Sequence, residues 1–267
     1  MKPRLVVPAL LAGAVIAAAM LAQPAQSARA QAADAGAPPL PDVSWSFEGP
    51  FGTFDRAALQ RGFQIYSQVC SACHSMNLLT YDDLAGPNGL GYTDTAVKAI
   101  AAQKQVADIG KDGQPIQRAA LPADHFVAPF PNENAARTAN NGAVPPDLSD
   151  IIKAREGGPR YVYGILTGFR EPPKNVTMRS GMNYNLYFPG HQIAMPQPLQ
   201  DDSAQYADGT KATLPQEAHD VVTFLTWASD PMTEQRKRTG AKVILFLLAM
   251  TGVLYGAKRR VWSDVEH

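Results

Sequence analysis

The sequence predicts a mainly α-helical protein, in which one exported domain is attached to a membrane by a single C-terminal helix. Three observations lead to this prediction: an apolar run behind basic residues at the N-terminus, two amphipathic segments with helical spacing, and a second apolar run at 240–257. With 267 residues, 45% of them hydrophobic, the chain is long enough for one or two domains with a sizeable core.

The first 30 residues have the pattern of a secretory signal peptide. Two basic residues precede an apolar run over residues 5–22, and small residues at 25–27 or 28–30 offer a cleavage site. An uncleaved N-terminal anchor is the alternative, because the apolar run is longer than most signal cores. Both interpretations place the residues that follow outside the cytoplasm.

The segment before the two cysteines is predicted to be a helix. Thr53 or Asp55 can cap its start, and apolar side chains then recur every three or four positions. The residues on this face are Leu59, Phe63, Tyr66, Cys70 and Cys73. The predicted apolar face therefore leads directly into the motif that carries the chemistry.

That motif is C-x-x-C-H, from Cys70 to His74, and it contains both cysteines of the chain, so a disulfide framework is excluded. A C-x-x-C pair in an exported protein indicates a redox dithiol, half of a zinc site or covalent haem attachment. The histidine directly after Cys73 favours haem c, in which both thiols add to the haem vinyl groups and the imidazole binds iron. Zinc would need two further ligands, and none lies at a familiar spacing.

A second axial ligand for the iron has to come from elsewhere in the chain. The candidates are Met178, Met182, Met195, His125, His191 and His219. Met195 stands out because Pro196 and Pro198 stiffen the loop that would hold its sulfur, although a methionine in such a loop is often a space filler. A thioether ligand raises the reduction potential, which suits electron transfer to a cytochrome c-like acceptor.

The stretch over residues 132–169 begins with a polar, turn-rich loop. Arg137 in this loop can donate hydrogen bonds to an anionic haem propionate, and a solvated surface arginine is the alternative. A helical pattern follows through Leu148, Ile151, Ile152, Tyr161, Tyr163 and Leu166.

Two helices are predicted near the C-terminus. The first starts at a capping box of Thr213 and Gln216 and ends before Pro231. Its apolar face consists of Ala218, Val221, Val222, Leu225 and Ala228. The second is a transmembrane helix over 239–258, with Lys242 inside its apolar run and basic residues on both flanks, for which a buried core helix is the alternative.

These segments divide the chain into four parts. We expect a signal peptide at 1–30, an exported c-type haem domain at 31–235, the transmembrane helix at 239–258 and a cytoplasmic tail at 259–267. The haem domain, with 14 basic and 22 acidic residues, carries a charge of −8. Such acidity favours a basic diffusing partner and disfavours nucleic acid, although solubility alone also explains an acidic surface. The acidic pairs at 82–83 and 201–202 are candidate docking charges.

Several blocks of sequence, in the same order, resemble the cytochrome c1 family. They are WSFEGPFGTFDRAALQRGFQIYSQVCSACHSM, ARTANNGAVPPDLSDIIKAREGGPRYVYGILTGF, NLYFPGHQIAMPQPL, YADGTKATLPQEAHDVVTFLTWASDP and the tail helix. The resemblance implies a class I cytochrome c-like haem domain with loop insertions, plus one C-terminal transmembrane helix. It also implies Cys70 and Cys73 as the haem attachments, His74 and Met195 as the axial ligands, and Arg137 near a propionate.

The resemblance implies an electron-carrier subunit of ubiquinol:cytochrome c oxidoreductase, the cytochrome bc1 complex, and not an enzyme on its own. Its partners would be cytochrome b, the Rieske iron-sulfur protein as electron donor, a soluble cytochrome c as acceptor, and membrane lipid. The location would be a bacterial inner membrane, crossed once, with the haem domain in the periplasm. The alternatives are another membrane-anchored monohaem c-type cytochrome, such as an oxidase subunit, and a haem enzyme or sensor with an open sixth position.

Overall fold

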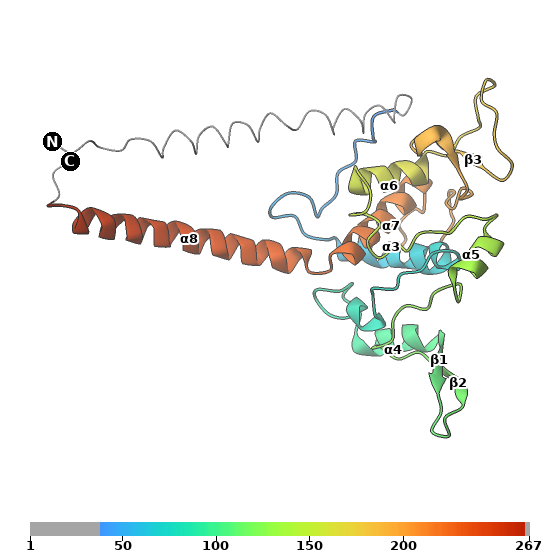
Figure 1. The fold of residues 1–267 in the computed structure, drawn as a ribbon, viewed down its shortest axis with the longest axis horizontal. Helices are drawn as coiled ribbons and strands as arrows, with labels where there is room; N and C mark the ends of the chain where they lie inside the picture. The colour runs from blue at the N-terminus through green and yellow to red at the C-terminus, as the bar shows by residue number, and fades with distance from the viewer. Residues whose placement is uncertain (1–37, 265–267) are drawn as a thin grey trace, which may run out of the picture.

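The computed structural model describes residues 38–264, and Figure 1 shows a group of packed helices from which one long helix, α8, extends. The α-helices are α3 (Arg56–Gln68), α4 (Asp94–Ala102), α5 (Glu133–Ala139), α6 (Gly158–Thr167), α7 (Leu214–Ser229) and α8 (Thr233–Val261). The 3-10 turns are η1 (Cys70–Ala72), η2 (Tyr81–Leu84) and η3 (Pro189–His191), and the strands are β1 (Gln105–Ile109), β2 (Pro115–Ala119), β3 (Asn183–Tyr184) and β4 (Gln192–Ile193). The mainly α prediction is confirmed, and the expected signal peptide lies outside the described residues.

Helix α3 begins where the sequence predicts and ends earlier. The Asp55 side chain accepts a hydrogen bond from the Ala57 amide at 2.9 Å, so Asp55 is the cap. The predicted continuous face as far as Cys73 is wrong, because the helix ends at Gln68, with Val69 as its C-cap. The chain then tightens into η1, which places the two thiols on a 3-10 turn instead of a helical face.

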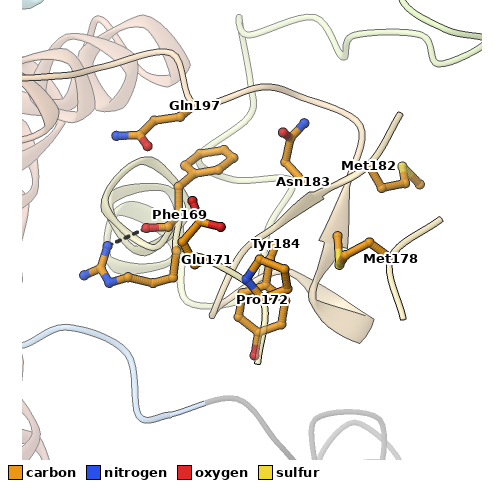
Figure 2. A pocket seen from close by; sticks show the side chains of 9 residues that line it. Phe169, Glu171, Pro172, Met178, Met182, Asn183, Tyr184 and Gln197 are labelled. Carbon is orange, nitrogen blue, oxygen red and sulfur yellow. Dashed lines mark hydrogen bonds between the residues drawn. The ribbon is translucent and has the colours of Figure 1, made fainter. Parts of the chain in front are cut away.

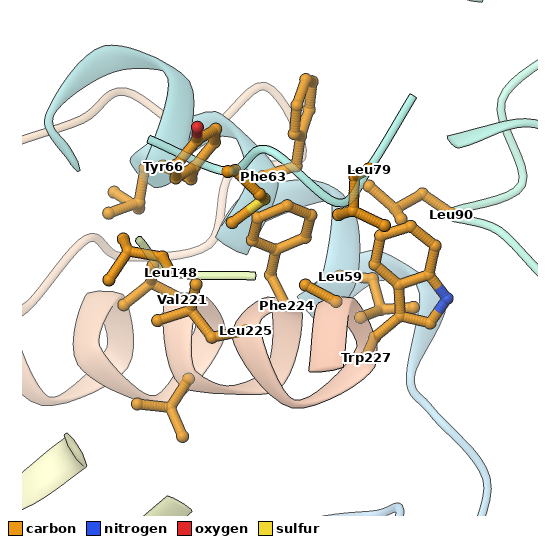
Figure 3. Packing of buried hydrophobic residues seen from close by; sticks show 14 of the residues in the cluster. Leu59, Phe63, Tyr66, Leu79, Leu90, Leu148, Val221, Phe224, Leu225 and Trp227 are labelled. Carbon is orange, nitrogen blue, oxygen red and sulfur yellow. The ribbon is translucent and has the colours of Figure 1, made fainter. Parts of the chain in front are cut away.

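Helices α3 and α7 cross at the centre of the core. The approach is close at Gly62, where a Cβ atom would lie 2.0 Å from the carbonyl oxygen of Asp220. Figure 3 shows the apolar side chains that fill the space between the two helices. The largest fully buried side chains in this region are Trp227, Phe224, Leu59 and Ile65. Both helices therefore contribute to one continuous apolar core.

The predicted apolar face of α7 is buried, and so is most of the rest of this helix. Thr213 caps it by accepting from the Gln216 amide at 3.4 Å, but the reciprocal half of the predicted capping box is replaced by bonds from Gln216 to Asp220. Residues on several sides of α7 are buried because both α3 and α6 pack against this helix.

Helix α6 is shorter than the helical pattern in the sequence suggested. Leu148, Ile151 and Ile152 are buried in the core, but they lie in turns before the helix. Gly157 has a φ of +82°, which breaks any helix there, and Pro159 then occupies the first turn of α6.

The hairpin formed by β1 and β2 is not among the predicted elements, although Asp112 and Gly113 in its turn are typical hairpin residues. Its strands pair antiparallel, from Gln105 opposite Ala119 to Ile109 opposite Pro115. In Figure 1 this hairpin projects from the helical core, well away from α8. Nearly every residue of both strands is exposed, including Ile109 at 71%.

Helix α8 contains the predicted transmembrane span and extends beyond it at both ends. Among the described residues it is the one helix long and apolar enough to cross a membrane, and its apolar window is fully exposed. A buried core helix is therefore excluded. Its first turn belongs to the domain, since the Glu234 carboxylate accepts bonds from the Phe54 amide at 2.8 Å and Arg56 at 2.9 Å.

Candidate functional site

The C-x-x-C-H motif forms a compact turn at the end of α3. The amides of Cys73 and His74 both donate to the carbonyl oxygen of Cys70, at 3.1 and 2.9 Å. Cys70 is half-buried against the core, whereas Cys73 is exposed, and both thiols are free. The turn therefore presents two thiols and an imidazole from five consecutive residues.

One nitrogen of His74 is fixed by a distant part of the chain. Its Nδ1 atom lies 2.7 Å from the carbonyl oxygen of Pro146, so Nδ1 carries the proton and Nε2 keeps its lone pair. Burial lowers the pKa of His74, while the Pro146 carbonyl and the Asp147 charge partly oppose this effect. Burial thus favours the neutral imidazole that a metal ligand requires.

Asp147 holds the segment on either side of this contact. Its Oδ2 atom accepts from the Ser75 hydroxyl at 2.8 Å and from the Asn77 amide at 2.9 Å, and its Oδ1 atom accepts from the Ser149 amide at 2.8 Å. Burial acts to raise the pKa of Asp147, but these hydrogen bonds outweigh it and hold the pKa below its ordinary value. The carboxylate stays charged and ties the two segments together.

The donor groups decide between the three chemistries that a C-x-x-C pair allows. No group of three His, Cys, Asp or Glu side chains within residues 38–264 is arranged to hold a metal ion, which disfavours zinc. Burial, followed by the charge of Cys73, raises the pKa of Cys70 to about 12, which disfavours the thiolate that a redox dithiol uses. Two thiols beside an oriented neutral imidazole fit covalently attached haem c.

Met195 lies in a second apolar cluster, with Ile165, Phe169 and Ile193. Tyr161 packs against both this cluster and the main core, against which Cys70 also lies. The Asn183 side-chain amide donates to the Met195 carbonyl at 3.3 Å and fixes the backbone of the loop. The thioether is therefore half-buried among apolar groups, as a sulfur ligand to haem iron would be.

Asn185 ties this loop to α6 and was not identified from the sequence. It is fully buried, its Nδ2 atom donates to the Ile165 carbonyl at 2.8 Å, and its Oδ1 atom accepts from the Tyr187 amide at 3.0 Å. A buried amide costs free energy unless it is hydrogen-bonded, so these bonds fix the loop geometry before Met195.

The other two candidate methionines line a cavity that adjoins the Met195 cluster, since Phe169 belongs to both. Met178 and Met182 line an open cavity of about 400 Å³, together with Phe169 and Gln197. Figure 2 shows both methionines at one end of this cavity, opposite Phe169 and Gln197.

The three candidate histidines have partners of their own. His125 forms a β-bridge with Thr80, and His219 stacks on Trp45 with ring centroids 5.6 Å apart. The Nδ1 atom of His191 lies 3.1 Å from the Asn185 carbonyl. None of these contacts by itself selects the distal ligand.

The predicted loop at Arg137 is wrong, because Glu133–Ala139 form helix α5 and Arg137 lies in its last turn with an exposed side chain. Its guanidinium lies 3.7 Å from the Glu133 carboxylate and donates a long bond of 3.4 Å to the Gly142 carbonyl. These weak contacts leave the guanidinium free to rotate towards an anion, as the sequence analysis expects, and equally suit a surface residue.

Comparisons with known proteins agree with this chemistry. The chain matches the family model described as Cytochrome C1 family over residues 45–265. It is 42% identical over 252 residues to cytochrome c1 of Rhodospirillum rubrum, covering 88% of this chain and 92% of that protein. It is 45% identical over 228 residues to a mitochondrial cytochrome c1 heme protein of Arabidopsis thaliana, covering 85% and 73%. Identity to a protein named cytochrome b/c1, from Bradyrhizobium diazoefficiens, is 44% over 252 residues, or 87% of this chain and 37% of that longer protein.

Proposed function

Because this chain belongs to the cytochrome c1 family, we propose that it accepts electrons from a Rieske iron-sulfur protein and passes them to a soluble cytochrome c. Family membership makes it an electron-carrier subunit of the cytochrome bc1 complex, with one covalently bound haem c, and not an enzyme on its own. The route of the electron and the residues that hold the haem are the proposal.

The contact between His74 and Pro146 carries this proposal. It fixes the imidazole with Nε2 available, directly beside the thiols of Cys70 and Cys73. These thiols would attach the haem and His74 would be the proximal ligand, while the haem supplies a one-electron iron couple. A carbonyl partner on Nδ1 holds the ring orientation and raises the basicity of the ligand.

Met195 would be the distal ligand. Its sulfur lies among apolar side chains, and the loop that carries it is fixed through Asn183 and Asn185. A thioether in the sixth position raises the potential and leaves no open site, which favours electron transfer over peroxidase or gas-sensor chemistry. Arg137 would donate to a haem propionate.

Helix α8 fits a single-pass membrane anchor. We place the haem domain in the periplasm of a bacterium, residues 239–258 in the inner membrane and the last residues in the cytoplasm. Cytochrome b and the Rieske protein would then be partners within the same membrane, and the acidic domain would meet a basic soluble cytochrome c.

The test is purification of the full chain from its native membrane in mild detergent. We expect cytochrome b and the Rieske protein to co-purify, and the reduced haem spectrum to stay unchanged under carbon monoxide. A spectrum that changes with carbon monoxide would indicate an open sixth position, as in a haem enzyme or sensor. Co-purification with an oxidase instead would identify another membrane-anchored cytochrome.

A further inference from the structure

One aromatic side chain near the start of α8 is exposed without a role in the core. In the loop before α3, Phe47 and Phe54 are 8% and 6% exposed and contact each other with ring centroids 5.1 Å apart. Phe51, between them, is 84% exposed. Single exposed apolar side chains are common on protein surfaces, so the place of Phe51 in the molecule carries the argument.

The loop that carries Phe51 is held in place by α8. The Lys237 ammonium donates to the carbonyls of Phe47 at 2.6 Å and Gly52 at 3.1 Å. The turn itself is tight, since a Cβ atom at Gly52 would lie 2.0 Å from the Glu48 carbonyl oxygen. Figure 1 shows this blue segment beside the start of α8. Phe51 is therefore presented by a fixed turn at the base of the long helix.

The Phe51 loop is attached to α8 at Lys237, close to the position where this helix would enter a membrane. The exposed apolar run of α8 starts at Val243, six residues after Lys237. At a rise of 1.5 Å per residue these positions are about 9 Å apart along the helix axis. The headgroup layer on each side of a bilayer is roughly 5–8 Å thick. The Phe51 loop thus lies at the outer surface of the headgroup layer if Val243 marks the edge of the hydrocarbon, so that the Phe51 side chain can reach into the headgroups.

The charges around this turn complement an anionic surface. Arg236, Arg238 and Lys242 lie with Lys237 on the first turns of α8, and the Arg236 and Arg238 side chains are 65% and 68% exposed. Arg236 pairs with Asp230 at 2.6 Å and Arg238 with Glu234 at 3.3 Å, and each exposed guanidinium keeps further donors for an anion. The domain that precedes them carries a charge of −8. An anionic bilayer repels that domain, whereas each basic residue near its surface adds attraction. The basic residues are thus concentrated where the chain enters the membrane.

We propose that the loop over residues 49–53 is a second membrane contact, in which Phe51 enters the headgroup layer of an anionic bilayer beside α8. Phe is among the side chains that interfacial segments bury in a membrane surface. Lys237 positions the loop, and the surrounding basic side chains bind lipid phosphates. Two contacts in place of one would restrict the tilt of the haem domain on its anchor. The proposal rests on the anchor role proposed for α8.

The experiment uses the full haem-containing chain in phosphatidylglycerol nanodiscs, with a fluorophore on a single introduced cysteine. In the haem-loaded chain the thiols of Cys70 and Cys73 would be thioethers, so the label reports one position. Three variants are compared: Phe51→Cys, Phe246→Cys on the exposed surface of α8, and Ile109→Cys on the β1–β2 hairpin. Fluorophore emission is measured in lipids with and without bromine on the upper acyl chain, because bromine quenches a fluorophore that lies beside it. The haem lowers emission equally in both lipids, so the ratio of the two measurements reports bromine quenching alone.

We expect bromine to reduce emission about twofold at positions 51 and 246 and to leave position 109 unchanged, as for side chains inside and outside the bilayer. Quenching at 246 without quenching at 51 overturns this proposal alone. Absence of quenching at both positions overturns the membrane anchor itself. Adding Lys237→Met removes both loop hydrogen bonds and should abolish quenching at 51 while preserving it at 246. Unchanged quenching at 51 in that variant would show that Lys237 does not position the loop.

Discussion

The Nδ1 atom of His74 lies 2.7 Å from the carbonyl oxygen of Pro146, a residue 72 positions later in the chain. This contact joins the turn of Cys70–His74, where we propose that the haem is attached, to the loop before α6. Because the acceptor is a backbone oxygen, no side-chain substitution removes it directly. Asp147 is the residue through which it can be tested, since its carboxylate binds Ser75, Asn77 and Ser149 around the contact.

We predict that Asp147→Ala destabilises the haem domain and disturbs the His74 ligand. Hydrogen bonds to a charged group each contribute about 1.5–3 kcal/mol, so losing three should lower the free energy of unfolding by at least about 2 kcal/mol. Thermal unfolding in detergent and the haem reduction potential measure both effects. The control is Asp150→Ala, which removes only an exposed carboxylate 3.8 Å from Lys153. Equal effects of both substitutions would contradict the role of Asp147.

We predict that Met195→Leu opens the sixth coordination position of the haem. Leucine preserves the apolar volume but has no sulfur, so the reduction potential should fall and carbon monoxide should bind the reduced haem. Spectra under carbon monoxide and a redox titration test this. Met178→Leu and Met182→Leu are the matched controls, because both are methionines in the neighbouring cavity of Figure 2 and not in the apolar cluster that holds Met195. A native spectrum for Met195→Leu, with loss of the spectrum in a control, would assign the ligand elsewhere.

The sequence identifies the part of the site that is contiguous. Cys70, Cys73 and His74 form a motif whose chemistry depends on spacing alone. Pro146 and Asn185 act through contacts with residues distant in sequence, and no local pattern distinguishes them from ordinary loop residues. A general rule does predict that His74 needs an acceptor on its second nitrogen, but it does not say which residue supplies it.

The fold was predictable where one face of a helix is apolar. The structure contains both the apolar face of α3 and the cap at Asp55. The end of α3 at Gln68 has no glycine or proline beside it, so the sequence does not indicate that the helix stops there. For α7, the apolar face was identified, whereas burial of Phe224 and Trp227 depends on α3 and the neighbouring loops. The β1–β2 hairpin is exposed on both faces, so its strands show no apolar alternation by which to recognise them.

We predict that Gly62→Ala separates α3 from α7. The added methyl group would lie 2.0 Å from the Asp220 carbonyl oxygen, and this is backbone that no rotamer change can move. Overpacking of this kind costs about 1–3 kcal/mol, which outweighs the gain in helix propensity of roughly 1 kcal/mol. Gly240→Ala is the control, since nothing lies within 4 Å of a Cβ atom there. A thermal midpoint for Gly62→Ala equal to that of the control would contradict the close contact.

We predict a pH-dependent contribution from Asp208. The Thr210 amide and Arg61, at 2.9 and 2.7 Å, hold the pKa of this carboxyl at about 2, below its ordinary 3.8. A lowered pKa stabilises the folded state above the ordinary value, and this stability is lost as the pH falls from 3.8 towards 2. Thermal midpoints of the wild type and Asp208→Asn should therefore converge over this interval and differ by a constant amount above it. A difference independent of pH would show that the carboxylate charge is not responsible.

Two of the acidic candidates for partner docking have structural roles. The Asp83 carboxylate accepts bonds from the Thr80 amide and hydroxyl at 2.7 and 2.8 Å. Asp201 accepts from the Leu214 amide at 2.7 Å, at the start of α7. Neutralising these residues would disturb η2 and α7 as well as the charge. Asp82 and Asp202 are exposed, so they are the appropriate positions at which to remove charge.

We predict that electron transfer to a basic soluble cytochrome c slows as salt rises. A domain charge of −8 attracts such a partner, and steering of this kind raises association rates by about ten- to a thousandfold at low salt. Exposed charges are screened beyond about 8 Å at physiological ionic strength, so the effect should appear in the association rate. Stopped-flow measurements across a salt series should give a second-order rate that falls with salt, and the double variant Asp82→Asn with Asp202→Asn should flatten the slope. Asp264→Asn, beyond α8, is the control for removing a carboxylate outside the haem domain and should leave the slope unchanged. A rate independent of salt in the wild type would mean that the acidity serves solubility or subunit contacts and that the partner docks through apolar surface.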